Sequence, residues 1–219
     1  MTPSRSSAAQ ARWTQRFRPP YTLGILYMQV GRLDEAVVEL KKAVALRPEN
    51  GDAWAILGST LKQDSRLEEA RDALEKAIPL MPSQPGPLVT LAAVLAEQAS
   101  AAASAADASQ AAGDQQKDDQ QRNLVSELRS QATECRRQAA ELSRAAVNRQ
   151  KASFALNAGN QLLLRGQIAD AVARYQESIA ADATFAEAHS QLAVAFERQG
   201  RADNAATERA KAKDLAPAR

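Results

Sequence analysis

Residues 20–48 read PYTLGILYMQVGRLDEAVVELKKAVALRP, and residues 54–82 read WAILGSTLKQDSRLEEARDALEKAIPLMP. Laid over each other, the two stretches place matching residue types 34 positions apart. The matching pairs are Leu23/Leu57, Gly24/Gly58, Tyr27/Leu61, Ala36/Ala70, Leu40/Leu74, Ala43/Ala77 and Pro48/Pro82. Self-similarity at a fixed period of this length is typical of a repeat array. The sequence therefore predicts two repeats, residues 17–50 and 51–84.

The same pattern returns near the C-terminus. It is carried first by Gly159, Leu162, Ala171 and Tyr175, and then by Leu192, Ala193, Phe196, Ala205, Ala212 and Pro217. Agreement in phase over four stretches makes a chance match improbable. We therefore predict two further repeats, residues 152–185 and 186–219.

Each repeat has the pattern of two amphipathic helices joined by a short polar turn. In the first repeat, apolar residues recur at helical spacing before and after Gly31, and Asp34 and Glu35 open the second helix. Acids in a first turn suit the positive end of the helix dipole. Small residues recur where the paired helices must approach closely, namely Gly24, Gly58, Ala92, Gly159 and Ala193. A large side chain at these positions should force the helices apart.

With Trp54 opening the second repeat, the spacing of Trp, Leu, Gly, large apolar, Ala, large apolar, Ala and Pro resembles the tetratricopeptide repeat (TPR) family. The resemblance implies an all-α fold, a right-handed superhelical solenoid of helix-turn-helix repeats. It also implies a protein that binds other proteins, through a concave groove built largely from the first helix of each repeat.

A third repeat begins in phase after Gln84, but the second-helix pattern does not follow. Residues 97–113 are rich in alanine, and residues 125–146 carry apolar or small residues at alternating spacings of three and four. These are Val125, Leu128, Ala132, Cys135, Ala139, Leu142 and Ala146. A heptad of this kind predicts a close-packed partner helix. We interpret residues 85–151 as an expanded third hairpin, a long Ala-rich helical hairpin or coiled coil with arms 86–112 and 119–148.

Two alternatives to this hairpin stay open at the level of sequence. The alanine-rich half could be a disordered linker, given its Ser, Gln and Asp content. The heptad could instead pair with a second copy of the chain, giving a homodimer, although its alanines bury little area. A monomer is the expected state. The two pairs of repeats could form one superhelix or hinge at residues 148–151.

Composition bears on the class of partner. The chain has 28 Lys and Arg against 26 Asp and Glu, so it lacks the strong positive charge typical of nucleic-acid binding. The arginines of the N-terminal segment, residues 1–16, form the one local excess, and we interpret it as a basic tail or cap. No membrane span and no secretory signal are expected, so the predicted location is cytoplasmic, although an organelle transit peptide shares this composition.

Catalytic and metal-binding sets are not evident in the sequence. His189 is the only histidine and Cys135 the only cysteine, and no glycine-rich phosphate loop is present. His189 stands at the position of Trp54, which favours a packing role, and Cys135 lies on the heptad. We therefore expect no enzyme activity, no cofactor and no metal site.

The resemblance also implies which residues face the groove. Those chosen as the candidate partner-binding set are Arg18, Tyr21, Ile25, Met28, Lys62, Leu156, Asn160, Glu197 and Arg198. Tyr21, Ile25 and Met28 would form an apolar patch for an extended or helical peptide. The same side chains could instead pack beneath the N-terminal segment, where Trp13 and Phe17 would cap the array.

Together these features predict a protein or peptide adaptor that acts through its groove. One alternative is a structural spacer or oligomerisation module that acts through residues 98–150. Another is the regulatory portion of a larger enzyme system, because TPR arrays are often joined to catalytic domains.

Overall fold

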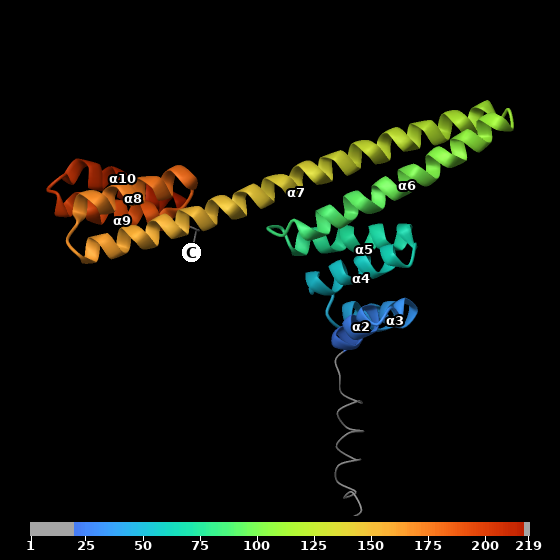
Figure 1. Ribbon diagram of the computed structural model, residues 1–219, viewed down its shortest axis with the longest axis horizontal. Coiled ribbons are helices and arrows are strands. Elements are labelled where there is room, and N and C mark those ends of the chain that lie inside the picture. The colour runs from blue at the N-terminus through green and yellow to red at the C-terminus, as the bar shows by residue number, and fades with distance from the viewer. Residues whose placement is uncertain (1–19, 217–219) are drawn as a thin grey trace, which may run out of the picture. The chain divides into compact units, whose positions relative to one another are not determined.

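The computed structural model describes residues 20–216, and within that range it contains helices and turns but no strand (Figure 1). The helices are α2 (Pro20–Gln29), α3 (Leu33–Leu46), α4 (Gly51–Gln63), α5 (Leu67–Leu80), α6 (Gly86–Ala111), α7 (Gln115–Leu164), α8 (Ile168–Ala181), α9 (Ala186–Arg198) and α10 (Ala202–Leu215). The predicted all-α class is confirmed. The basic segment 1–16 and Arg18 lie outside the described range.

The chain divides into two compact units, residues 1–140 and 141–219. In unit 1, α2 pairs with α3 and α4 pairs with α5, while α4 packs on α3 and α6 packs on α5 and α4. The core is apolar and continuous across these helices and the first part of α7. Its members include Leu40, Leu57, Leu61, Leu74, Leu91, Val94, Leu95, Leu128 and Ala132.

In unit 2, the last part of α7 belongs with α8, α9 and α10. The core here includes Leu156, Tyr175, Leu192 and Phe196. The buried Ser178 hydroxyl donates a hydrogen bond of 2.7 Å to the carbonyl oxygen of Ala152, which fixes α8 against α7. Each unit thus repeats the two-helix hairpin that the sequence predicts.

The turn between paired helices has one geometry throughout. Gly31, Gly166 and Gly200 all adopt φ between 74 and 77°, a left-handed conformation that favours glycine. In the second repeat this position is Ser65, whose φ is 58°. A non-glycine residue held in this region costs about 1 kcal/mol, so the second repeat keeps the shared turn at an energetic cost.

Close approach of paired helices explains the regular spacing of small residues along this chain. A Cβ atom on Gly24 would lie 2.6 Å from Leu40 Cγ, and one on Gly58 would lie 2.5 Å from Leu74 Cγ. On Gly159 it would lie 2.5 Å from Tyr175 Cε1. These separations are too short for real atoms, so the predicted close approach is confirmed at all three glycines.

Residues 86–111 form one continuous helix, so the alanine-rich half is not a disordered linker. The chain turns at Gly113, with φ of 73°, and α7 returns along α6 (Figure 1). Val125, Leu128, Ala132 and Ala139 are buried and Cys135 is half-buried. The heptad therefore packs within the chain in this part. That the hairpin is an expanded third repeat stays a prediction.

The second arm differs from the prediction of residues 119–148. It begins at Gln115 and continues as one helix of 50 residues to Leu164, through residues 148–151, where a hinge had been one of two possibilities. The physical reason is that no glycine or proline occurs between Gly113 and Gly159, so nothing in the chain interrupts the helix. The buried heptad of residues 125–139 does not extend along the rest of α7, because Leu142 is only half-buried and Ala146 is exposed.

The expectation that no apolar segment is long enough to span a membrane needs a correction. Within the described range, α6 has the length and composition of a spanning helix, with a mean hydropathy of 1.4 over its best 18 residues. Length and composition do not separate a span from a core helix. In unit 1, Leu91, Val94 and Leu95 of α6 are core residues, which accounts for its apolar character.

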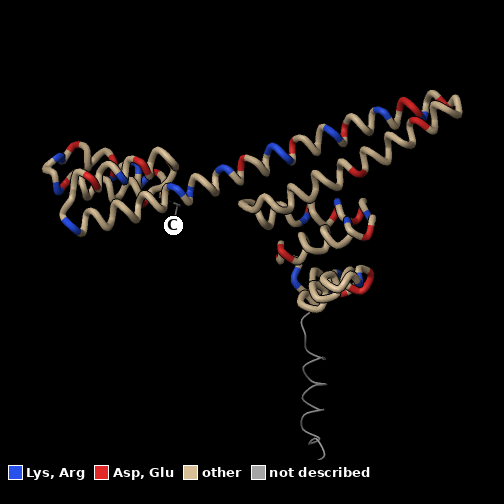
Figure 2. The backbone as a smooth tube through the Cα atoms, viewed as in Figure 1, with Lys and Arg blue, Asp and Glu red and all other residues tan. Residues whose placement is uncertain are grey.

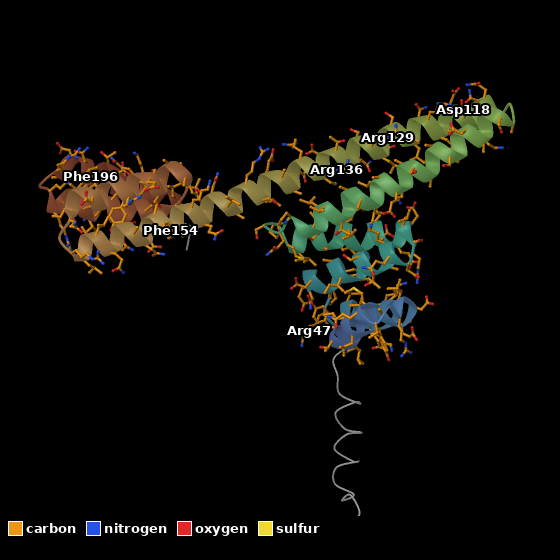
Figure 3. All side chains as sticks on the ribbon, in the orientation of Figure 1. Arg47, Asp118, Arg129, Arg136, Phe154 and Phe196 are labelled. Carbon is orange, nitrogen blue, oxygen red and sulfur yellow. The ribbon has the colours of Figure 1, made fainter. Side chains whose placement is uncertain are left out.

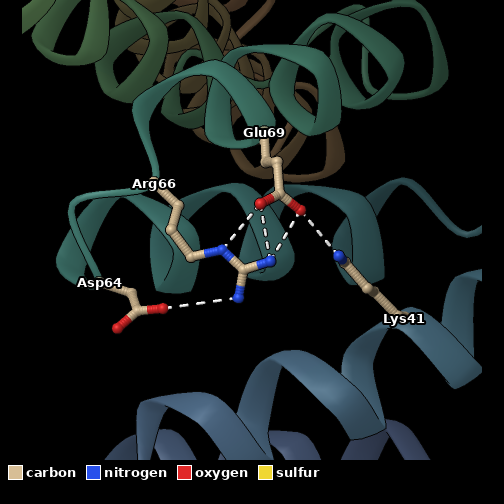
Figure 4. A network of polar contacts seen from close by, with 4 residues as sticks. All are labelled: Lys41, Asp64, Arg66 and Glu69. Atoms are coloured by element: carbon tan, nitrogen blue, oxygen red, sulfur yellow. Dashed lines mark hydrogen bonds and ion pairs between the residues drawn. The ribbon is translucent and has the colours of Figure 1, made fainter.

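Charged residues of both signs are interspersed along the helices (Figure 2). One network joins the second helices of the first two repeats (Figure 4). Glu69 on α5 accepts hydrogen bonds from Lys41 on α3 at 2.7 Å and from Arg66 at 2.8 Å, and Arg66 also pairs with Asp64 at 3.6 Å. These bonds lower the pKa of the Glu69 carboxyl, with Lys41 as the largest cause. The network links neighbouring repeats at the surface.

Candidate protein-binding surface

The first helices of unit 1, α2, α4 and α6, lie next to one another and share one face. We call it the first-helix face. Its rows, each spaced by 34 residues, are Tyr21/Ala55/Val89, Ile25/Ser59/Ala93 and Met28/Lys62/Ala96. Most of these side chains are half-buried, and Val89 is exposed. The face is therefore open to solvent and largely apolar.

One end of the first-helix face carries charge. Lys62 Nζ on α4 lies 3.0 Å from Glu97 Oε1 on α6. The pair bridges the two helices, and both side chains keep contact with water. An exposed pair of this kind adds little to stability, commonly about 0.2–1 kcal/mol. Its carboxylate and ammonium groups can therefore exchange partners at modest cost when a ligand offers a better one.

The other end of the face carries Tyr21 beside a cavity of about 250 Å³. The cavity lies between the start of α2 and the end of α3 and is lined by Tyr21, Ala43, Leu46 and Asn50 among others. Burial raises the pKa of the Tyr21 phenol, and the nearby Asp52 carboxylate raises it further. The phenol is thus a neutral hydrogen-bonding group at neutral pH.

The cavity has a counterpart in the second repeat. Pro20 holds the position that Trp54 holds there. The Trp54 ring packs against Lys76 and donates a hydrogen bond of 2.8 Å to the carbonyl oxygen of Pro48. Because proline lacks both the indole and its N–H, this place in the first repeat is left open.

The candidate residues of unit 2 do not form a matching face. Leu156 is only 3% exposed and belongs to the core, so its assignment to a groove is wrong. The Leu156 side chain packs with the apolar core of unit 2, whereas the corresponding residues of unit 1, Tyr21, Ala55 and Val89, are half-buried or exposed. Asn160 accepts a hydrogen bond of 2.8 Å from the Tyr175 hydroxyl. Glu197 pairs with Arg209, and Arg198 donates to the Leu163 carbonyl at 3.4 Å.

His189 has the packing role expected from its position. Its Nε2 lies 3.2 Å from the carbonyl oxygen of Ala183. This contact corresponds to the hydrogen bond from Trp54 to the carbonyl oxygen of Pro48 in unit 1. Its Nδ1 lies 2.6 Å from a carboxylate oxygen of Glu208 on α10. Both ring nitrogens thus lie within hydrogen-bond distance of an oxygen atom. His189 is buried and joins α9 to α10.

Acid should weaken this contact, because the pKa of Glu208 is lowered. Burial opposes ionisation, but hydrogen bonds from Lys211 and His189 outweigh it. A carboxyl with a depressed pKa stabilises the fold above its unfolded pKa, and the contribution is lost as the pH falls through the folded value. We expect Glu208→Gln to destabilise unit 2 at pH 7 by about 1–2 kcal/mol, and by much less near pH 3. Urea unfolding at both values checks this, and an equal loss at both would contradict it.

The remaining reactive groups do not assemble into a site. Burial raises the pKa of the Cys135 thiol, and the neighbouring Glu134 adds to the shift, which disfavours a reactive thiolate. Among residues 20–216, no three His, Cys, Asp or Glu side chains lie close enough to hold a metal ion. The surfaces available for function in the described range are therefore helix faces.

Sequence reasoning missed one exposed apolar feature. Phe154 and Val147 project from α7 in unit 2 and are largely exposed, and Phe154 is marked in Figure 3. The sequence contained a signal for Phe154, because the residues that correspond to it in α4 and α9 are Ala53 and Ala188. A phenylalanine where α4 and α9 carry alanine indicates a face that no helix of the same unit covers.

Comparison with known families identifies two matching regions. Residues 21–85 match the family model "Tetratricopeptide repeat", and residues 159–200 match the model "TPR repeat". The chain therefore contains TPR repeats in both of its units. No protein with a curated description matches the sequence.

Several solved structures are similar over most of the chain. MamA is 18% identical, with 88% of this chain and 94% of MamA covered and a TM-score of 0.40. YrrB, described as a TPR protein with an unusual peptide-binding site, is 18% identical, with coverage of 98% and 93% and a TM-score of 0.41. TTC0263, a thermophilic TPR protein of Thermus thermophilus, is 22% identical, with 90% of each chain covered and a TM-score of 0.41.

Proposed function

We propose that this chain is a non-catalytic scaffold that binds a protein or peptide partner, and that the partner docks on the first-helix face of unit 1. TPR repeats in both units support an interaction role. The observation that carries the proposal is the set of partly exposed apolar side chains on the first-helix face, namely Tyr21, Ile25 and Met28 on α2 and Val89 on α6. A ligand that covers these side chains gains apolar burial without displacing any core residue.

The charges along the face suggest how a ligand would be oriented. Its apolar anchors would cover Ile25 and Met28, and its polar or charged groups would meet Lys62 and Glu97 on the neighbouring helices. Specific polar contacts fix the register of a peptide whose affinity comes from buried apolar side chains. A segment with two or three apolar residues beside an acid or base fits this arrangement.

The decisive experiment compares two variants with opposite locations in unit 1. Ile25→Asp with Met28→Asp places charge on the first-helix face, whereas Val38→Asp places it on the exposed surface of α3. We expect the face variant to lose at least tenfold in partner recovered from a lysate of the source cells, and the α3 variant to bind like the parent chain. Quantitative mass spectrometry measures the recovery.

The parent chain and the two variants should have equal helix content by circular dichroism. The substituted side chains are all at least partly exposed, so the new charges are not placed in the core. Equal recovery with the face variant would remove the first-helix face as the docking site. Equal loss in both variants would point to a general effect of added negative charge. The spacer alternative cannot be tested by deleting residues 98–150, since Ala99, Leu128 and Ala132 belong to the core of unit 1.

A further inference from the structure

Two repeats carry a ring at the same position near the start of their first helix. The rings are Trp54 on α4 and His189 on α9, and each lies within hydrogen-bond distance of a carbonyl oxygen in the loop that precedes its helix. Each also contacts the second helix of its own repeat. The Trp54 ring contacts Lys76 on α5, and His189 contacts Glu208 on α10. The ring thus joins the preceding loop to the second helix.

The first repeat has no ring at this position, because Pro20 stands there. The leucine that ends each second helix shows the difference. Leu80 of α5 is 41% exposed and Leu215 of α10 is 37% exposed, in the two repeats that carry a ring. Leu46 of α3, in the repeat that lacks one, is 71% exposed. The first repeat therefore lacks apolar cover at this place.

The cavity of about 250 Å³ described above lies at this place, and we call it the ring cavity. Its lining includes Pro20, Tyr21, Ala43, Leu46, Arg47 and Asn50. Proline, alanine and leucine give it apolar walls, and asparagine and arginine supply polar groups at its edge. An aromatic side chain, which buries about 150–250 Å², suits a site of this kind, and the indole of tryptophan adds a hydrogen-bond donor.

A segment of this chain that carries such a side chain directly precedes the cavity. Residues 1–19, which lie outside the described range, end next to Pro20 and contain Trp13 and Phe17. Trp13 is seven residues before Pro20, and seven residues span at most about 25 Å. The cavity begins at Pro20 itself, so Trp13 is within reach of it. Covalent attachment also gives this ring an effective concentration that a free ligand rarely attains.

The charges of the segment and of the cavity rim are complementary. Residues 1–19 contain four arginines and no acid. Near the cavity, Glu49 precedes the lining residue Asn50, and Asp52 acts on the Tyr21 phenol. Within residues 20–216, neither carboxylate has an ion-pair partner. The two acids outnumber the basic Arg47 of the lining, so this rim favours a basic segment.

We propose that residues 1–19 dock on the first repeat of the same chain and that the Trp13 indole occupies the ring cavity, as the Trp54 ring occupies the equivalent place in the second repeat. The arginines of the segment then lie near Glu49 and Asp52. The contact leaves Ile25 and Met28 of the first-helix face open. It therefore neither replaces the proposed partner-binding function nor rests on it.

The test measures trypsin cleavage after Arg16 in the full chain, followed by mass spectrometry. Cleavage tracks the fraction of molecules in which the segment is released. Pro20→Phe places a ring in the cavity at the position of Trp54, so it should displace Trp13. We expect cleavage to become at least about tenfold faster, because burying an aromatic side chain contributes more than a factor of ten. The control Pro20→Ala leaves the cavity open and should stay within about twofold of the parent chain.

Tryptophan fluorescence identifies the ring. In a Trp54→Phe background, Trp13 is the only tryptophan of the chain. We expect acrylamide to quench its emission less in the folded chain than in urea. Adding Pro20→Phe should raise the quenching of the folded chain to the level seen in urea, whereas Pro20→Ala should not. Circular dichroism should show equal helix content in every variant.

Four results would each overturn the proposal. The first is a parent chain cleaved after Arg16 as fast as a synthetic peptide of residues 1–19, which would leave the cavity to another ligand. The second is equal cleavage of the Pro20→Phe and Pro20→Ala variants. The third is equal quenching of Trp13 in the folded and unfolded chain. The fourth is cleavage that becomes faster on dilution, which would mean that the segment comes from a second copy.

Discussion

Replacing Gly58 with valine should destabilise unit 1 by about 3 kcal/mol, at the upper end of what overpacking usually costs. A Cβ at this position would lie 2.5 Å from Leu74 Cγ and 3.2 Å from the carbonyl oxygen of Ala70. Both neighbours are fully buried, so neither can move without opening the core. The gain of about 0.3 kcal/mol in helix propensity when glycine is replaced by valine cannot offset this, and branching at Cβ adds two further clashing methyl groups.

The measurement is urea unfolding followed by circular dichroism, with Gly86→Val as the control. Gly86 is the first residue of α6, and a Cβ there would meet nothing within 4 Å. The control should cost clearly less than Gly58→Val, because its only expected cost is the strain of a branched residue before Pro87 at the start of α6. If the two valine variants unfold alike, close helix approach is not what the glycine provides.

The glycine positions also show what could be predicted from the sequence. Gly24, Gly58 and Gly159 were expected at close helix contacts, and each lies against the large residue sixteen positions later, Leu40, Leu74 or Tyr175. Such contacts are local to one hairpin and recur in each repeat, so periodicity alone reveals them. The helix class and the repeats follow from the same local pattern.

Features that depend on the absence of a signal were harder to predict. The repeat register ended the second arm at residue 148 and left a hinge at residues 148–151 open, yet no glycine or proline stands there to end α7. The burial of Leu156 likewise depends on what packs against it from other helices, which its own position in a repeat does not specify. Because α7 continues through residues 148–151, no separate helix of unit 2 precedes Phe154 to cover it. The sequence prediction ended the helix at residue 148 and therefore missed the exposed apolar face of unit 2.

Open faces rather than reactive groups distinguish the two units of this chain. In unit 1 the open apolar residues lie on the first helices, where Ile25 and Met28 are half-buried. In unit 2 the first-helix positions are occupied by internal contacts, such as the one between Asn160 and Tyr175, and the open apolar residues are Val147 and Phe154 on α7 instead. The two units therefore suit different kinds of contact, and variants in one should leave the other unaffected.

Replacing Tyr175 with alanine tests that independence and should have the largest effect on unit 2. The ring is fully buried, lies against Gly159 where Leu40 and Leu74 lie in unit 1, and its hydroxyl donates to Asn160 at 2.8 Å. Removing a buried aromatic side chain costs about 3–5 kcal/mol. A domain the size of residues 141–219 has a total stability of roughly 4–12 kcal/mol, so the variant should lose a large share of it.

Hydrogen exchange with mass spectrometry can read the two units separately in the intact chain. We expect faster exchange in peptides from α8 and α9 of the Tyr175→Ala variant, and unchanged exchange in peptides from α4 and α5. Tyr175→Phe keeps the ring and removes only the hydrogen bond to Asn160, so it should cost about 1 kcal/mol. Equal acceleration in both units would mean that they unfold as one, because α7 is continuous through both and could couple them. Acceleration confined to unit 2 would mean that a helix of 50 residues joins two cores that are stabilised separately.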